Sequence, residues 1–242
     1  NGSGKRWNLV ANPFPSYLNA NDNADGTNNF LKVNLASGVI DATYSAIYGW
    51  KADGTGYAIY NNSSPAATYI APGQGFWVAA ASTSSVNLSF TEAMQTATGG
   101  DDFIAGRTTS TSFELVLDMH NDDIKVSDTK FYFKEGLTLG LDPGYDAGAF
   151  NQSSGLSSRL VEQDNGVGMG INAMPVDVLS NLIVPLTIEQ EAGIALKIQI
   201  ANSTIPEDIN VYLEDTIENK RLYLDLTYIN LLTKNNFLKI LP

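Results

Sequence analysis

The chain has 242 residues, 43% of them hydrophobic, so it is long and apolar enough to bury one or two cores. Its formal charge of −12 argues against nucleic acid and anionic membrane surfaces as partners, because both select a basic face. The absence of cysteine excludes disulfides and thiolate metal sites, and no apolar run approaches the roughly 18 residues needed for membrane insertion.

The first hundred residues alternate between short β patterns and turn signals. Residues 7–10 alternate and then stop at Pro13 and Pro15, which cannot donate to a β ladder. Residues 19–29 are dense in Asn, Asp and Gly and are expected to form a loop. Further strands are expected at residues 30–35, 42–50, 56–60, 69–78 and 86–90, the fourth of them entered through a Pro-Gly turn.

The second half shows the same organisation with longer strands. Residues 112–119 alternate and place four apolar side chains on one face: Phe113, Leu115, Leu117 and Met119. More strands are expected at residues 130–133, 168–173, 182–186, 195–200, 211–215 and 221–226, and residues 157–162 favour a single helical turn.

This pattern predicts an all-β fold of two consecutive antiparallel β-sandwich, jelly-roll-like domains. The small, polar and Gly-rich residues 91–102 mark the boundary between a domain over residues 1–101 and an acidic domain over residues 102–230. The acidity is concentrated in the second of these, since residues 102–242 hold twenty of the 26 acidic side chains. Residues 231–242 are expected to be a tail.

Five aromatic side chains of the first half are candidates for a sugar-stacking platform: Trp7, Trp50, Tyr57, Tyr60 and Trp77. Exposed together, they would offer flat apolar surface with polar edges. The alternative is that they are core residues, as aromatic residues in sandwich strands usually are. The four ligand-binding candidates we retain are Trp50, Tyr57, Tyr60 and Trp77.

A calcium loop is the second candidate site. Asn21, Asn23 and Asp25 place oxygen-bearing side chains at alternate positions before Gly26, as at the start of a calcium-binding loop. The twelfth position, where such loops carry a bidentate glutamate, is Lys32. The alternative is a turn stabilised by Asn and Asp side chains without metal.

No catalytic constellation emerges from the acidic residues or from His120, the only histidine. His120 lies between Asp118 and Asp122, but no Gly-x-Ser-x-Gly elbow supplies a nucleophile, so a solvated strand end is expected. Asp142 and Asp146 flank Pro-Gly and favour a turn over a cation or sugar site. Paired acids at 122–123, 207–208 and 214–215 could serve a glycosidase but are expected to be acidic turns, so no enzyme is predicted.

Several segments resemble the C-terminal region of large secreted or surface Bacteroidetes proteins exported by the type IX secretion system. The matching segments follow the order found in those proteins and are spaced over nearly the whole chain: residues 7–16, 47–50, 70–78, 131–136, 141–148, 171–175 and 211–215. The chain departs from them in a shorter connection at residues 216–220, and residues 236–242 resemble the opening of a sorting domain.

The resemblance implies a secreted or outer-surface location and delivery by the type IX machinery through an adjoining sorting domain. It implies no particular substrate. We expect a non-enzymatic structural or adhesive module whose partners are surface glycans or other surface proteins. The alternative function is a carbohydrate-binding module attached to a polysaccharide-degrading enzyme.

Overall fold

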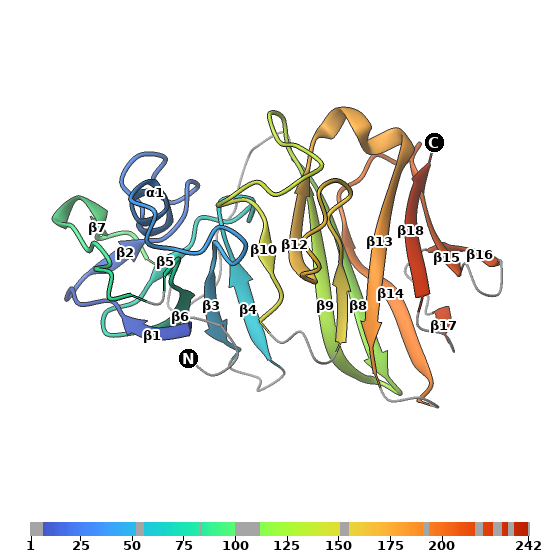
Figure 1. Ribbon diagram of the computed structural model, residues 1–242, viewed down its shortest axis with the longest axis horizontal. Helices are drawn as coiled ribbons and strands as arrows, with labels where there is room; N and C mark the ends of the chain where they lie inside the picture. Colours follow the sequence, from blue (N-terminus) through green and yellow to red (C-terminus); the bar gives the residue numbers. More distant parts are fainter. Residues whose placement is uncertain are drawn as a thin grey trace. The chain divides into compact units, whose positions relative to one another are not determined.

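A computed structural model describes residues 7–51, 56–82, 84–99, 112–150, 155–190, 194–215, 220–224, 229–231 and 235–241 of the chain. Nearly all regular structure in these residues is β-strand, and most strand pairs are antiparallel (Figure 1). The predicted all-β fold class is therefore confirmed, while the arrangement as two sandwiches stays a prediction.

The chain divides into two compact units. Unit 1 contains residues 1–110 together with residues 142–147, and unit 2 contains residues 111–141 and 148–242. The segment 142–147 thus belongs to the first unit although it follows the first strands of the second. β10 (Ala147–Gly148) lies where the chain returns to unit 2.

Unit 1 holds two small antiparallel sheets. The four-stranded sheet has the order β1-β6-β3-β4, and the three-stranded sheet has the order β5-β2-β7. The strands are β1 (Trp7–Ala11), β2 (Tyr17–Asn19), β3 (Ile47–Trp50), β4 (Tyr57–Tyr60), β5 (Tyr69–Ile70), β6 (Gly75–Ala79) and β7 (Gln95–Thr96). A short 3-10 helix, η2 (Glu92–Met94), precedes β7.

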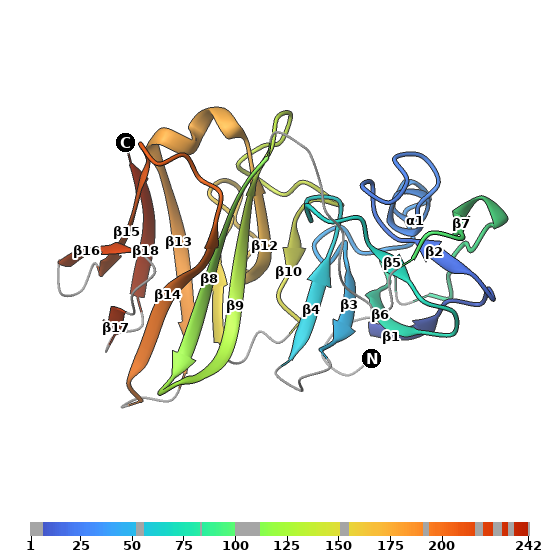
Figure 2. The ribbon, with the colours of Figure 1, turned by 180° about the vertical axis from the view of Figure 1, so that it is seen from behind.

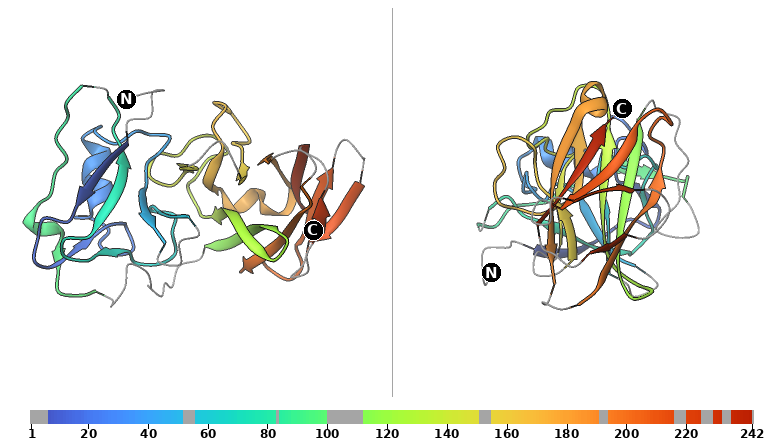
Figure 3. Two further views of the ribbon diagram at one scale, coloured as in Figure 1. Left: turned by 90° about the horizontal axis from the view of Figure 1, so that it is seen from below. Right: turned by 90° about the vertical axis from the view of Figure 1, so that its right-hand side faces the viewer.

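The strand expected at residues 30–35 is wrong, because this segment forms the helix α1 (Phe30–Ala36). The side chain of Asn29 caps the helix by accepting the Lys32 N–H at 2.8 Å. Phe30 packs edge-on against Phe76 of β6 with ring centroids 5.2 Å apart, so α1 covers the inner face of the four-stranded sheet (Figure 3). Burial of Phe30 and Leu31 in this core favours a helix over the strand that local alternation indicates.

The strand expected at residues 86–90 does not form either, and these residues have no regular structure. The buried side chain of Asn34 binds both backbone groups of Ser89, accepting its N–H at 2.8 Å and donating to its C=O at 3.0 Å. The Asn34 side chain thus makes the two backbone hydrogen bonds that a neighbouring strand would otherwise make with Ser89.

Unit 2 is built on one large sheet, whose order is β16-β15-β18-β13-β11-β12-β9-β8-β14-β17 (Figures 1 and 2). Its strands are β8 (Phe113–Asn121), β9 (Ile124–Phe133), β11 (Gly155–Ser158), β12 (Met169–Met174), β13 (Leu182–Glu189), β14 (Leu196–Ser203), β15 (Asn210–Asp215), β16 (Lys220–Leu224), β17 (Ile229–Leu231) and β18 (Asn235–Leu241). The 3-10 helix η3 (Val176–Asn181) joins β12 to β13. β12 and β9 run parallel, whereas the other neighbouring strands in this order pair antiparallel.

Two expectations for unit 2 need correction. The helical turn expected at residues 157–162 is replaced in its first part by β11. Residues 231–242 are not a separate tail, because β18 lies between β13 and β15 inside the sheet. The core prediction for residues 112–119 holds, since Leu115, Leu117 and Met119 are fully buried in the main apolar cluster of unit 2.

Candidate functional site

The four-stranded sheet of unit 1 has one face in the core and one face carrying aromatic side chains. Side chains alternate between the two faces of a strand, so Phe76 and Val78 of β6 point into the core and Trp77 points the opposite way. Leu9 of β1 is the register partner of Trp77, and Tyr48 of β3 is its partner on the other side. The outer face is therefore apolar across three strands.

The exposed part of this outer face consists of Leu9, Trp50, Tyr57 and Trp77, which we call the aromatic face. Leu9 and Trp50 are each 61% exposed, while Tyr57 and Trp77 are half-buried. Trp50 and Tyr57 are register partners on β3 and β4, and their rings meet edge-on with centroids 5.0 Å apart. An indole with most of its surface in water, braced by a neighbouring ring, is a preformed stacking surface.

At Tyr48 the outer face is covered by a second group of aromatic side chains. The Tyr48 side chain is fully buried, and the Trp7 ring packs edge-on against it at 4.7 Å. Tyr44 meets Trp7 at 5.4 Å. Burial raises the pKa of Tyr48 well above its ordinary value, and Tyr44 and Asp41 add to this effect. Tyr48 is therefore covered by Trp7 and does not contribute to the exposed part of this face.

The structure separates one residue from the predicted platform. Tyr60 is the register partner of Ile47, a core residue, and therefore lies on the inner face of the sheet. Trp50, Tyr57 and Trp77 share the outer face. Leu9 was missed by the sequence analysis, because only its pairing with Trp77 brings it there.

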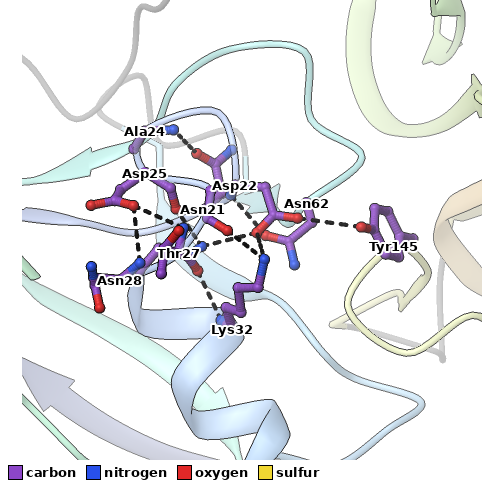
Figure 4. Close-up of polar contacts among 11 residues, drawn as sticks. Asn21, Asp22, Ala24, Asp25, Thr27, Asn28, Lys32, Asn62 and Tyr145 are labelled. Atoms are coloured by element: carbon purple, nitrogen blue, oxygen red, sulfur yellow. Dashed lines mark hydrogen bonds and ion pairs between the residues drawn. The ribbon is translucent and has the colours of Figure 1, made fainter.

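The candidate calcium loop is held together by its own polar side chains (Figure 4). Asn21 is fully buried and donates to the C=O groups of Asn61 (3.2 Å) and Ala66 (2.9 Å). Its Oδ1 accepts the N–H groups of Ala24 at 3.2 Å and Thr68 at 2.9 Å. All four hydrogen bonds of this amide are thus made with the backbone.

The other two predicted ligands have separate partners. Asn23 donates to the C=O of Ser64 at 2.8 Å. Asp25 accepts the N–H groups of Thr27 (2.8 Å) and Asn28 (3.0 Å), and these bonds hold the pKa of its carboxyl below the ordinary value. Asp25 and the Asn21–Ala24 bond thus stabilise the turn, and Asn21 and Asn23 also tie it to residues 61–68; calcium binding by this loop stays a prediction. In the described part of the chain, no group of three or more His, Asp or Glu side chains is placed to hold a metal ion.

We expect calcium to leave the thermal unfolding of the protein unchanged, because the Asn21 Oδ1 that would ligate it already accepts two backbone N–H groups. The measurement is the melting temperature with calcium and with a chelator, for the natural chain and for Asp25→Ala. A rise in melting temperature with calcium that Asp25→Ala abolishes would assign the metal to this loop.

Residues 142–147 are bound into unit 1 by buried polar contacts. The Tyr145 C=O accepts hydrogen bonds from Asn61 Nδ2 at 2.6 Å and Ser63 Oγ at 2.8 Å, and the Gly144 N–H donates to Ser45 Oγ at 2.6 Å. Asp146 is fully buried and its Oδ2 accepts the Asp142 N–H at 2.6 Å. One of the two carboxylates proposed for this loop is thus enclosed, as expected of a turn.

Comparison with known proteins identifies the family of this chain. A family model described as a domain of unknown function, DUF8693, matches residues 1–231. The chain belongs to the DUF8693 family. No curated protein and no solved structure gives a significant match.

The DUF8693 match includes most of both units, so the aromatic face and segment 142–147 lie within one family domain. It ends at β17 and does not include β18. No helix among the described residues of this DUF8693 chain is long and apolar enough to cross a membrane.

The expectation that His120 of the DUF8693 domain lies on a solvated strand end is wrong. His120 and Asp118 are each only 7% exposed, and the His120 Nε2 lies 3.9 Å from Asp118 Oδ2. Lys125 bridges Asp118 at 2.7 Å and Asp128 at 2.9 Å. Alternation correctly places Asp118 and His120 opposite the apolar face, but that face is buried too.

Proposed function

We propose that the chain is a non-enzymatic module of a secreted or cell-surface protein, serving as a structural and adhesive part of a larger type IX secretion cargo. Its contact surface in this proposal is the aromatic face. The observation that carries the proposal is the 61% exposure of Trp50 beside Tyr57 on the outer face of a rigid antiparallel sheet. Burying an indole in the core would be favourable. A folded domain that instead keeps an indole exposed to water is typical of one with a binding surface.

A neutral saccharide is the ligand class that fits this surface best. The carbon-bound hydrogens on one side of a pyranose ring form a flat apolar patch that packs against an indole ring. The side chains of the aromatic face are uncharged, so the face offers sulfated glycans and uronic acids no ion-pairing partner of its own. The all-β scaffold keeps Trp50 and Trp77 on adjacent strands of one sheet, so the surface is formed before the ligand arrives.

The export part of the proposal is supported by the resemblance of seven segments to type IX cargo proteins. Several of those segments form ordered parts of the fold, including the partly buried loop 141–148 and the strands β3, β6 and β15. Delivery would require a sorting domain in the parent protein, which the type IX machinery recognises.

A glycan array tests the binding proposal. We expect the natural chain to be retained by neutral glycans and Trp50→Ala to weaken retention at least about ten-fold, as expected for loss of a central aromatic contact. Trp50 is mostly exposed, so its replacement leaves the fold intact. Tyr60→Ala is the matched control, because it removes an aromatic ring from the inner face of the same sheet.

Two results would decide against this proposal: no glycan retained by the natural chain, or equal weakening by Trp50→Ala and Tyr60→Ala. The second candidate function, a carbohydrate-binding module attached to a polysaccharide-degrading enzyme, uses the same aromatic face. It predicts retention on insoluble polysaccharides in a pull-down, whereas an adhesin predicts retention on cell-surface glycans.

A further inference from the structure

β18 is a central strand of unit 2 that lies beyond the family domain. It pairs antiparallel with β13 from Leu182↔Ile240 to Thr187↔Asn235 and antiparallel with β15 from Asn210↔Leu241 to Asp215↔Asn236. Figure 1 shows it between these two strands. The family match ends at residue 231, before β18 begins.

Without β18 the sheet would be divided. Among the described strands, β13 pairs otherwise only with β11, and β15 pairs otherwise only with β16. Removing β18 would leave β13 and β15 each with an open edge of backbone N–H and C=O groups. The hairpin β15–β16 would then have no ladder to the rest of the sheet.

The two flanking strands define what can fill the gap. Val184 of β13 and Leu213 of β15 are fully buried, and both pair with position 238. Leu182 and Val211, which are 3% and 4% exposed, both pair with position 240. Positions 238 and 240 are leucine and isoleucine in this chain. The flanking register thus calls for apolar residues at alternate positions of the inserted strand.

We propose that the gap between β13 and β15 is a strand-acceptor site of the family domain. Its ligand is an extended peptide with apolar residues at alternate positions, bound antiparallel to both neighbours by β-augmentation. In this chain residues 235–241 occupy the site. The strand that completes the sheet therefore comes from residues that lie after the end of the family match.

The test uses the full chain, folded and then cut at a protease site inserted between β17 and β18. We expect fragment 235–242 to stay bound to the cut protein through gel filtration. We also expect it to exchange with a fluorescent peptide of the same sequence, followed by polarisation. Amides of residues 182–187 and 210–215 should stay protected from hydrogen exchange only while the site is occupied.

Two peptide variants make the test specific. Leu238→Thr in the peptide should weaken binding at least about ten-fold, because position 238 lies between two buried side chains. Lys239→Thr is the matched control, since position 239 pairs with the exposed Ile183 and the half-buried Tyr212, and the substitution introduces the same residue. Equal weakening by both variants would overturn the proposal. Release of the fragment with unchanged amide protection of β13 and β15 would also overturn it.

Discussion

Replacing Asn21 by alanine is expected to lower the free energy of unfolding of unit 1 by about 3–5 kcal/mol. The side chain is fully buried and makes four hydrogen bonds, all to backbone groups from three different segments of unit 1. Alanine would remove a partner from two N–H and two C=O groups. The Ala24 N–H keeps its bond to the Asn21 C=O and the Asn61 C=O keeps the one from the Ser64 N–H, so the largest loss falls on the buried Thr68 N–H. Each buried group that stays unsatisfied costs about 1–3 kcal/mol, and rearrangement and water recover part of the sum.

Tryptophan fluorescence is the suitable measurement, because all three tryptophans of the chain belong to unit 1. Denaturant unfolding followed at this signal reports the stability of unit 1 separately from unit 2. Asn23→Ala is the matched control: it lies in the same loop, is half-buried and donates one hydrogen bond, to Ser64. We expect it to cost about 1 kcal/mol. Similar losses for the two variants would show that Asn21 does not organise the loop.

Gly144→Ala is expected to destabilise unit 1 by about 2–3 kcal/mol. Gly144 has φ +91°, a conformation that side chains disfavour, and an added Cβ would lie 2.9 Å from Leu35 Cδ1 and 3.3 Å from Asn62 Nδ2. Its N–H and C=O bind Ser45 and Asn62. Relieving the clash would require the half-buried Leu35 side chain to shift, or movement of a segment that is fixed at both backbone groups.

Gly136→Ala separates the two causes of that loss. Gly136 has φ +81° but no atom within 4 Å of an added Cβ, so alanine there meets backbone strain without a clash. We expect about 1 kcal/mol for Gly136→Ala, measured by the same denaturant method with circular dichroism, because this residue belongs to unit 2. A loss at Gly144 no larger than at Gly136 would show that segment 142–147 is not tightly packed.

Alternation of apolar residues predicted the strands well where both neighbours were strands. The expected strands around β8, β9, β14 and β15 all form, because the two faces of a large sheet impose a period of two. Residues 30–35 failed because the decisive signals lie outside the alternating run. They are the Asn29 cap and the stop at Gly38, which has φ +67°.

The candidate sites show the same limit. The sequence correctly indicated which side chains alternate together, but it did not indicate what covers each face. His120 was placed opposite the apolar cluster and is buried all the same, whereas Trp50, a ligand-binding candidate whose alternative was a place in the core, is exposed. Partners such as Asn61 and Ser63, which bind Tyr145 more than 80 positions away, have no local signal in the sequence.

The inclusion of residues 142–147 in unit 1 has a consequence for how the protein can be taken apart. The polypeptide passes from one unit to the other after residues 110, 141 and 147, so a scission at the first crossing separates residues 1–110 from segment 142–147, which stays covalently joined to unit 2. A gene fragment that stops near residue 101 would encode unit 1 without the segment that Asn61, Ser63 and Ser45 enclose. In such a fragment the polar groups that bind segment 142–147 would lack their partners. Its stability in solution would therefore differ from that of unit 1 in the intact protein.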